Sequence, residues 1–187
     1  MKNRPFALLT LLTLAIGFTG LSAFVVAPAA TTTIAPASLA ETIKWLTIEE
    51  AVVQLQKEPR KIVIDVYTDW CGWCKKMDKG TFADPAVAAY INKNYYAVKL
   101  DAESKKPITL NGHTYKYNPE YKSHELAVAL LQGQMSYPTT VYLNEKMEML
   151  SPVPGYLDAA AFSKILRFFG DNHYKKTSWA EYEKKRK

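Results

Sequence analysis

Hydrophobic residues along this chain form strand-like apolar runs that alternate with segments of helical spacing, which is the pattern of an α/β protein. Apolar runs of strand length predict strands at 62–67, 96–100, 139–143 and 147–150, the last two as an antiparallel pair around the turn at 144–146. Segments between them predict helices at 48–57, 85–92 and 158–169. The run at 62–67 is almost entirely apolar, as in a central strand that is covered on both faces. We therefore expect a central mixed sheet with helices on both faces.

Residues that begin and end helices support these boundaries. Thr47 opens a capping box with Glu50, and Pro59 stops the helix that follows. Asp84 precedes a proline and predicts the start of the next helix, and Asp158 is the expected cap of the last one. Gly155, just before that helix, would allow an unusual backbone angle.

Residues 102–135 are more numerous than a plain connection between two strands needs. Asn111-Gly112 predicts a hairpin turn between short strands at 108–110 and 113–115. This segment is therefore expected to be structured. It could cover a sheet edge, or it could form a lip that contacts a substrate or partner.

The second half of that segment contains a further helix signal. Ser123 is the expected cap of a helix over 124–132. His113 and His124 are interpreted as ordinary polar surface residues rather than catalytic ones.

The first 40 residues are interpreted as a secretion signal and the end of its leader. Two basic side chains precede an apolar stretch from about residue 6 to 26, and small residues offer cleavage sites ending at Ala23, Ala29 or Ala40. An uncleaved membrane anchor is the alternative, since about 20 apolar residues span a bilayer. Removal of the leader leaves about 150 residues, enough for one domain.

The formal net charge of +6 lies at the two ends of the chain. Residues 1–40 have two basic and no acidic side chains, and residues 174–187 have six basic and two acidic ones, so the part between has no net charge. No basic face with a recognition motif is evident, which argues against a nucleic-acid partner. The basic tail at 174–187 is expected to be a solvated helix end, and weak contact with a membrane or an acidic partner is the alternative.

The chemistry of the chain is concentrated in its only two cysteines, Cys71 and Cys74. They stand in the run 67–76 that follows the strand at 62–67, and a two-residue spacer on the first turn of a helix lets two sulfurs form a small-ring disulfide. A zinc site would need four ligands, and the three histidines lack the required spacing. A purely structural disulfide would close too small a loop to stabilise the fold much. Thiol–disulfide exchange is the favoured interpretation, and we expect no metal and no cofactor.

The segment 61–75 resembles the strand, active-site loop and helix start of the thioredoxin family. The resemblance continues through the strand at 98–101, through Ser136-Tyr137-Pro138-Thr139-Thr140 as the cis-proline loop, and through the last helix. It covers roughly residues 45–170 and is closest to secreted bacterial thioredoxin-like proteins and to the thioredoxin-like domain of membrane-linked disulfide reductases. It implies a thioredoxin fold over residues 41–173, with an insertion at about 102–135 before the cis-proline loop.

The resemblance also implies roles for the residues of the strand and the helix. Cys71 would be the attacking thiolate, more exposed and stabilised by the helix N-terminus, and Cys74 the resolving thiol. Asp65 stands where thioredoxins have a buried carboxyl group, whose raised pKa would suit exchange of a proton with Cys74. Lys99 matches a family lysine near that acid, in either a proton-relay or a structural role.

A second set of residues is expected to contact substrate. If the Tyr137-Pro138 bond is cis, its backbone could pair with an extended substrate segment, whereas a trans bond would make it a surface turn. Gly72 lies between the cysteines. Trp70 and Trp73 are expected to form the apolar surface around Cys71, although Trp70 could also belong to the core.

These observations predict a periplasmic thiol–disulfide oxidoreductase that reduces protein disulfides. Its own disulfide would then be reduced by a membrane-linked or other thiol donor. Gly72-Trp73 replaces the Gly-Pro of ordinary thioredoxins, and because the spacer tunes the reduction potential, an oxidase or isomerase is an alternative. A non-catalytic chaperone or binding module of the same fold is a third interpretation.

Overall fold

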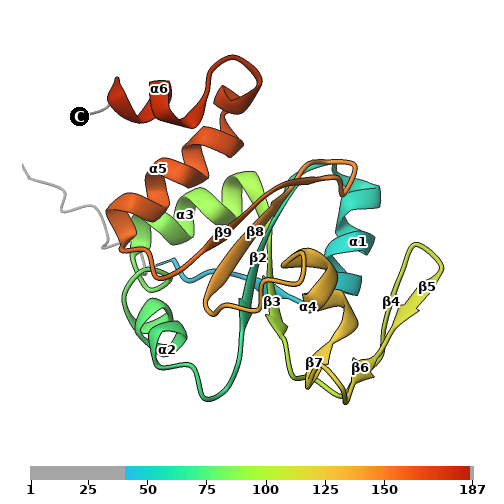
Figure 1. The fold of residues 1–187 in the computed structure, drawn as a ribbon. Helices are drawn as coiled ribbons and strands as arrows, with labels where there is room; N and C mark the ends of the chain where they lie inside the picture. The colour runs from blue at the N-terminus through green and yellow to red at the C-terminus, as the bar shows by residue number, and fades with distance from the viewer. Residues whose placement is uncertain (1–40, 186–187) are drawn as a thin grey trace, which may run out of the picture. The chain divides into compact units, whose positions relative to one another are not determined.

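A five-stranded mixed sheet in the order β1-β3-β2-β8-β9 lies at the centre of the structure, a computed structural model that describes residues 41–185 (Figure 1). β1 and β2 run parallel to β3 on either side of it, whereas β8 is antiparallel to both β2 and β9. The leader expected at 1–40 lies outside the described residues. The strands of the sheet are β1 (Trp45–Leu46), β2 (Lys61–Tyr67), β3 (Tyr95–Asp101), β8 (Thr139–Leu143) and β9 (Met149–Pro154).

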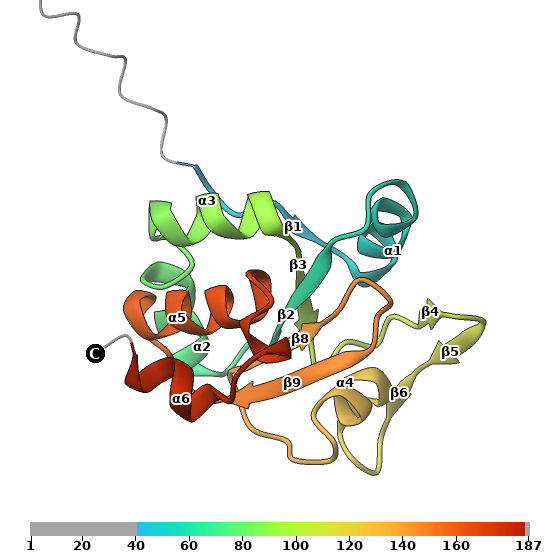
Figure 2. The same cartoon turned by 90° about the horizontal axis from the view of Figure 1, so that it is seen from above.

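Helices cover both faces of this sheet, as the sequence predicted (Figure 2). Their core residues separate into two clusters, and α2, α3, α5 and α6 contribute to one while α1 and α4 contribute to the other. The alternation of side chains along β2 places Val63 in the first cluster and Ile64 in the second. The helices are α1 (Ile48–Lys57), α2 (Gly72–Lys79), α3 (Pro85–Asn94), α4 (Glu125–Leu130), α5 (Ala159–Gly170) and α6 (Trp179–Lys184).

The predicted helix caps are confirmed. Thr47 and Glu50 form the capping box of α1, and the Asp84 carboxylate accepts hydrogen bonds from two backbone N–H groups at the start of α3. Asp158 caps α5, and Gly155 has the positive φ of 96° that favours glycine.

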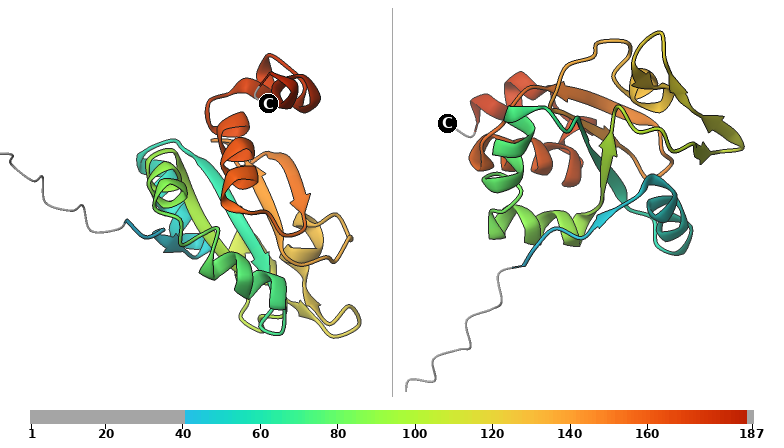
Figure 3. Two further views of the ribbon diagram at one scale, coloured as in Figure 1. Left: turned by 90° about the vertical axis from the view of Figure 1, so that its left-hand side faces the viewer. Right: turned by 90° about the horizontal axis from the view of Figure 1, so that it is seen from below.

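The segment 102–135 is structured and lies on the side of the sheet that carries α1 and α4 (Figure 3). β4 (Ile108–Leu110) and β5 (His113–Tyr115) form the predicted hairpin, and both residues of its Asn111-Gly112 turn have positive φ. A second short ladder precedes α4, formed by β6 (Tyr117–Asn118) and β7 (Ser123–His124).

The prediction for the start of α4 was wrong. Ser123 lies in β7, and His124, interpreted as a surface residue, is completely buried and is the N-cap. Its Nδ1 accepts a hydrogen bond from the backbone N–H of Leu126, and its Nε2 lies 3.1 Å from the carbonyl oxygen of Lys106. Neutral imidazole can make both bonds if Nε2 bears the proton. Sequence reasoning missed this role because serine is a favoured N-cap residue and histidine is not.

The end of the chain also differs from the prediction. β9 runs to Pro154 rather than ending near residue 150, and it is an edge strand, where prolines are tolerated because one side has no pairing partner. The helix expected to be last, α5, is followed by a 3₁₀ helix, η1 (His173–Lys175), and by α6.

The predicted basic tail is a folded segment as far as residue 185. Ser178 and Glu181 form a capping box at the start of α6. Tyr182 is 4% exposed, and the Trp179 ring meets the Phe168 ring of α5 edge to face at 5.2 Å. One face of α6 therefore belongs to the core, while Lys184 and Lys185 at its end are exposed. Within residues 41–185, no helix has the length and apolar character needed to cross a bilayer.

Candidate active site

The two cysteines lie where β2 passes into α2. Cys71 is the N-cap of α2, and its sulfur accepts a hydrogen bond from the backbone N–H of Cys74 at 3.1 Å. The two side chains are joined in a disulfide, with Cα atoms 5.3 Å apart. The predicted position on the first helical turn is confirmed, and the structure represents the oxidised form of the pair.

The expected difference in exposure between the sulfurs is not found. Cys71 is 4% exposed and Cys74 is 2% exposed, so both are buried in the disulfide form. What separates them is their place on α2, because a side chain at the N-cap faces the unpaired N–H groups and the positive end of the helix dipole. A negative charge is therefore better stabilised on Cys71 than on Cys74.

Trp70 is a surface residue, which decides between the two roles that the sequence left open. Its side chain is 66% exposed, and its ring meets that of Tyr137 edge to face at 5.9 Å. The indole N–H donates a hydrogen bond to a carboxylate oxygen of Glu103 at 3.0 Å. Glu103 belongs to the segment 102–135, so this segment contacts an aromatic residue directly beside Cys71.

Trp73, which stands between the two cysteines in the sequence, forms a second exposed aromatic surface. It is 56% exposed, and its ring lies 5.2 Å from that of Tyr156. The Lys76 ammonium lies 4.7 Å from the Trp73 ring centre and 4.9 Å from that of Tyr156. Because this places the cation over both rings, cation–π attraction holds Lys76 beside Trp73.

The Tyr137–Pro138 peptide bond is cis, as predicted. It immediately precedes β8, and the carbonyl of Pro138 accepts a hydrogen bond from the backbone N–H of Gly155 at 2.8 Å. Through the contact between Tyr137 and Trp70, the loop borders the residue before Cys71.

Asp65 is buried in β2, as expected, with 1% exposure. Lys99 donates to its Oδ2 at 2.7 Å, while its Oδ1 has no hydrogen-bond partner among residues 41–185. Burial raises the pKa of Asp65 and outweighs the nearby ammonium, which acts in the opposite direction. An acid held in this way can take up a proton at higher pH than an exposed aspartate.

Lys99 connects Asp65 with α2. Its ammonium also pairs with Asp78, which stands four residues after Cys74, so that Asp78 and Cys74 lie on the same side of the helix. Burial disfavours the charged form of Lys99, but Asp65 and Asp78 more than offset this and raise its pKa. The buried carboxyl group is therefore linked through Lys99 to the face of α2 that carries Cys74.

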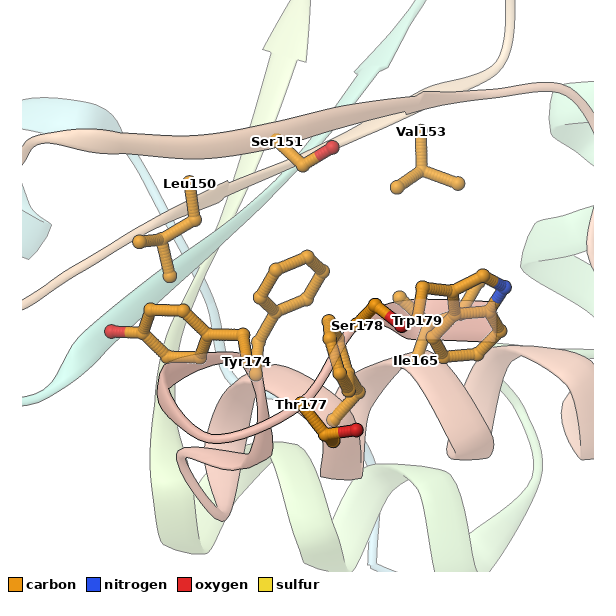
Figure 4. A pocket seen from close by; sticks show the side chains of 10 residues that line it. Leu150, Ser151, Val153, Ile165, Tyr174, Thr177, Ser178 and Trp179 are labelled. Carbon is orange, nitrogen blue, oxygen red and sulfur yellow. The ribbon is translucent and has the colours of Figure 1, made fainter. Parts of the chain in front are cut away.

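A further hollow lies away from the cysteines. It has a volume of about 520 Å³ and lies between β9, α5 and the C-terminal segment (Figure 4). The residues that line it are mainly apolar: Leu150, Ser151, Val153, Ile165, Phe168, Phe169, Tyr174, Thr177, Ser178 and Trp179. None of them belongs to α2 or to the cis-proline loop, so this hollow is separate from the disulfide.

A strand, a disulfide at the start of the next helix and a cis-proline loop that contacts the residue before the first cysteine are the features of a thioredoxin-fold protein. The chain belongs to the thioredoxin-like family, since the family model described as "Thioredoxin-like domain" matches residues 48–170. It is similar to the "Thiol:disulfide interchange protein DsbD" of Klebsiella pneumoniae, with 27% identity over 122 residues. That alignment covers 64% of this chain and 17% of the relative, so the chain spans less than a fifth of that protein's length.

Solved structures agree on the fold. One titled "DsbH Oxidoreductase" has a TM-score of 0.51 and 16% identity, covering 68% of this chain and 84% of that one. A thioredoxin from Thermus thermophilus has a TM-score of 0.51 and 19% identity, covering 70% and 88%. At these identities the likeness supports the fold alone.

Proposed function

We propose that this protein is a periplasmic thiol–disulfide oxidoreductase that reduces protein disulfides. The observation that carries the proposal is the Cys71–Cys74 disulfide at the N-terminus of α2, flanked by exposed Trp70 and Trp73. A structural disulfide has no need of apolar side chains exposed around it. Large exposed apolar groups are typical of a surface that binds another protein.

The reaction begins with the reduced pair. The Cys71 thiolate attacks one sulfur of a substrate disulfide, forms a mixed disulfide and expels the other substrate sulfur as a thiolate. Cys74 loses its proton and attacks the sulfur of Cys71, which releases the second substrate thiolate. The substrate gains two electrons, and the protein is left with the Cys71–Cys74 disulfide. A dithiol donor, which could be membrane-linked, then reduces that disulfide.

Asp65 is the proposed acceptor of the Cys74 proton. Its Oδ1 has no hydrogen-bond partner in residues 41–185, and its raised pKa makes proton uptake easier than at an exposed aspartate. Lys99 keeps the carboxyl group in place and links it to α2. Because it also lies within 5.3 Å of three aromatic ring centres, Lys99 is assigned a positioning role.

Substrate is proposed to bind across Trp70, Gly72, Trp73 and the Tyr137-Pro138 backbone, adding an extended segment beside the cis-proline loop. The named relative supports exchange chemistry, and the leader predicted at 1–40 supports export. The reducing direction is favoured by Asp65 and is tested by the reduction potential of the cysteine pair. The binding-module interpretation is separated from catalysis by the following experiment.

We expect the reduced protein to accelerate reduction of insulin disulfides by dithiothreitol, measured as turbidity from the precipitating B chain. The physical reason is that Cys71 supplies a stabilised thiolate at an accessible aromatic surface. The Cys71→Ser/Cys74→Ser double variant, which retains the whole surface, is the control and should give the uncatalysed rate. Equal rates for the two proteins would leave only the binding-module interpretation.

A further inference from the structure

The exposed side of α2 carries a row of lysines that begins beside the disulfide. Gly72, Lys75, Lys76 and Lys79 follow the spacing i, i+3, i+4 and i+7, which places them on one helix face. Together with Gly80 and Tyr156 they line a hollow of about 480 Å³. We refer to Lys75, Lys76 and Lys79 as the lysine row.

The charge of the lysine row is not neutralised within the described part of the protein. No carboxylate of residues 41–185 lies within 4.0 Å of any of these three ammonium groups. The one acidic residue of α2, Asp78, is paired with Lys99 of β3. The positive end of the α2 dipole adds to the same field at Gly72.

A carboxylate lies at Trp70, the residue before Cys71, because Glu103 accepts the hydrogen bond of the Trp70 indole N–H. The surface around the disulfide therefore has the lysine row at α2 and a carboxylate at Trp70. Charged groups placed in this way can select a partner and fix its orientation.

We infer that the lysine row binds acidic residues that flank a cysteine in the protein substrate. This inference rests on the proposed function, since the hollow starts one residue after Cys71 and would be covered by a substrate engaged there. The Trp73 and Tyr156 rings keep the Lys76 ammonium next to Trp73, where substrate would lie. A concave site beside the reactive sulfur fits a peptide segment better than it fits a flat anionic membrane.

Peptide binding tests the inference without depending on catalysis. Three ten-residue peptides with serine in place of the central cysteine, flanked by glutamates, glutamines or lysines, are titrated into the oxidised protein and followed by NMR. We expect the glutamate peptide to bind about tenfold more tightly than the glutamine peptide at low salt, with shifts at Lys75, Lys76, Lys79 and Tyr156. Because exposed charges are screened, the preference should vanish at about 1 M salt.

A matched pair of variants locates the effect. Changing the three lysines of the row to glutamine should abolish the preference, whereas the same change at exposed Lys44, Lys57 and Lys93, on other elements, should preserve it. Equal affinity for the glutamate and glutamine peptides, or a preference that survives loss of the row, would overturn the inference. So would row-dependent binding to phosphatidylglycerol vesicles without any preference for the glutamate peptide.

Rates with the corresponding disulfide peptides separate this inference from the proposed function. The row variant should lose about tenfold of the acidic peptide's rate relative to the glutamine peptide, so that it reduces the two disulfide peptides at nearly equal rates. Failure of the unaltered protein to reduce any disulfide would defeat the proposed function, while charge-selective binding of the serine peptides would still support the lysine row as an acidic-peptide site.

Discussion

Cys71→Ser is expected to lower the rate of disulfide exchange by more than roughly 1,000-fold, because the serine hydroxyl is not ionised at neutral pH and cannot attack a disulfide. Cys74→Ser is expected to fail differently. Attack by Cys71 survives in that variant, but nothing resolves the mixed disulfide, so substrates remain covalently attached. The measurement is non-reducing gel electrophoresis of each variant after incubation with oxidised substrate protein.

The two variants test whether position on α2 assigns the roles, since exposure does not distinguish the sulfurs. Alkylation of the reduced protein with iodoacetamide, followed by peptide mass analysis, provides an independent reading. We expect faster modification at Cys71, the N-cap. Trapped complexes in Cys71→Ser rather than in Cys74→Ser, or equal alkylation of both thiols, would contradict the assignment.

Asp65→Asn is expected to slow exchange by about 10- to 100-fold, with the loss concentrated in resolution of the mixed disulfide. Asparagine has nearly the same volume as aspartate but cannot take up the proton of Cys74. Stopped-flow exchange from about pH 6 to 9 should show a titration in the unaltered protein that the variant lacks. The control is Asp78→Asn, which removes the other, half-exposed carboxylate of Lys99 and should leave the profile nearly unchanged.

Asp65→Asn is also expected to change stability, and the sign of the change follows from the raised pKa of Asp65. A group whose pKa is higher in the folded state than the usual 3.8 binds its proton more tightly there. The free energy of unfolding therefore falls as pH rises above about 4 and through the folded-state pKa. Asp65→Asn removes this dependence, so the free energy of unfolding of the variant should rise relative to that of the unaltered protein as pH increases.

Urea unfolding at a series of pH values measures this difference. Identical pH dependence of stability and of exchange in the two proteins would make Asp65 a structural residue and require another proton acceptor for Cys74. A stability difference without any change in the exchange profile would give the same conclusion about catalysis.

The elements around the cysteines were predictable because their signals are local. The apolar run of β2 ends four residues before Cys71, and the capping residues of α1, α3 and α5 stand within a few positions of the groups they cap. The burial of Asp65 was expected from the apolar strand around it and from the family resemblance. The cis bond before Pro138 was expected from the resemblance alone, because sequence spacing does not determine peptide-bond isomers.

The residues that sequence reasoning missed act through contacts between distant parts of the chain. Glu103 reaches Trp70 across 33 positions, and Tyr156 meets Trp73 and Lys76 from the connection between β9 and α5. The hydrophobic periodicity of the sequence gives no indication of such contacts. His124 escaped notice for a different reason, since a histidine that caps a helix from a buried position breaks the usual preferences for both capping and burial.

The reduction potential of the Cys71–Cys74 couple is the measurement that tests the central claim most directly. It is obtained by equilibrating the protein in glutathione or dithiothreitol redox buffers and counting free thiols by mass after alkylation. The proposal of a reductase predicts a value nearer the roughly −270 mV of thioredoxin than the roughly −120 mV of a strong oxidase. A value near −120 mV would contradict the reducing direction, because the disulfide would then accept electrons from substrate thiols.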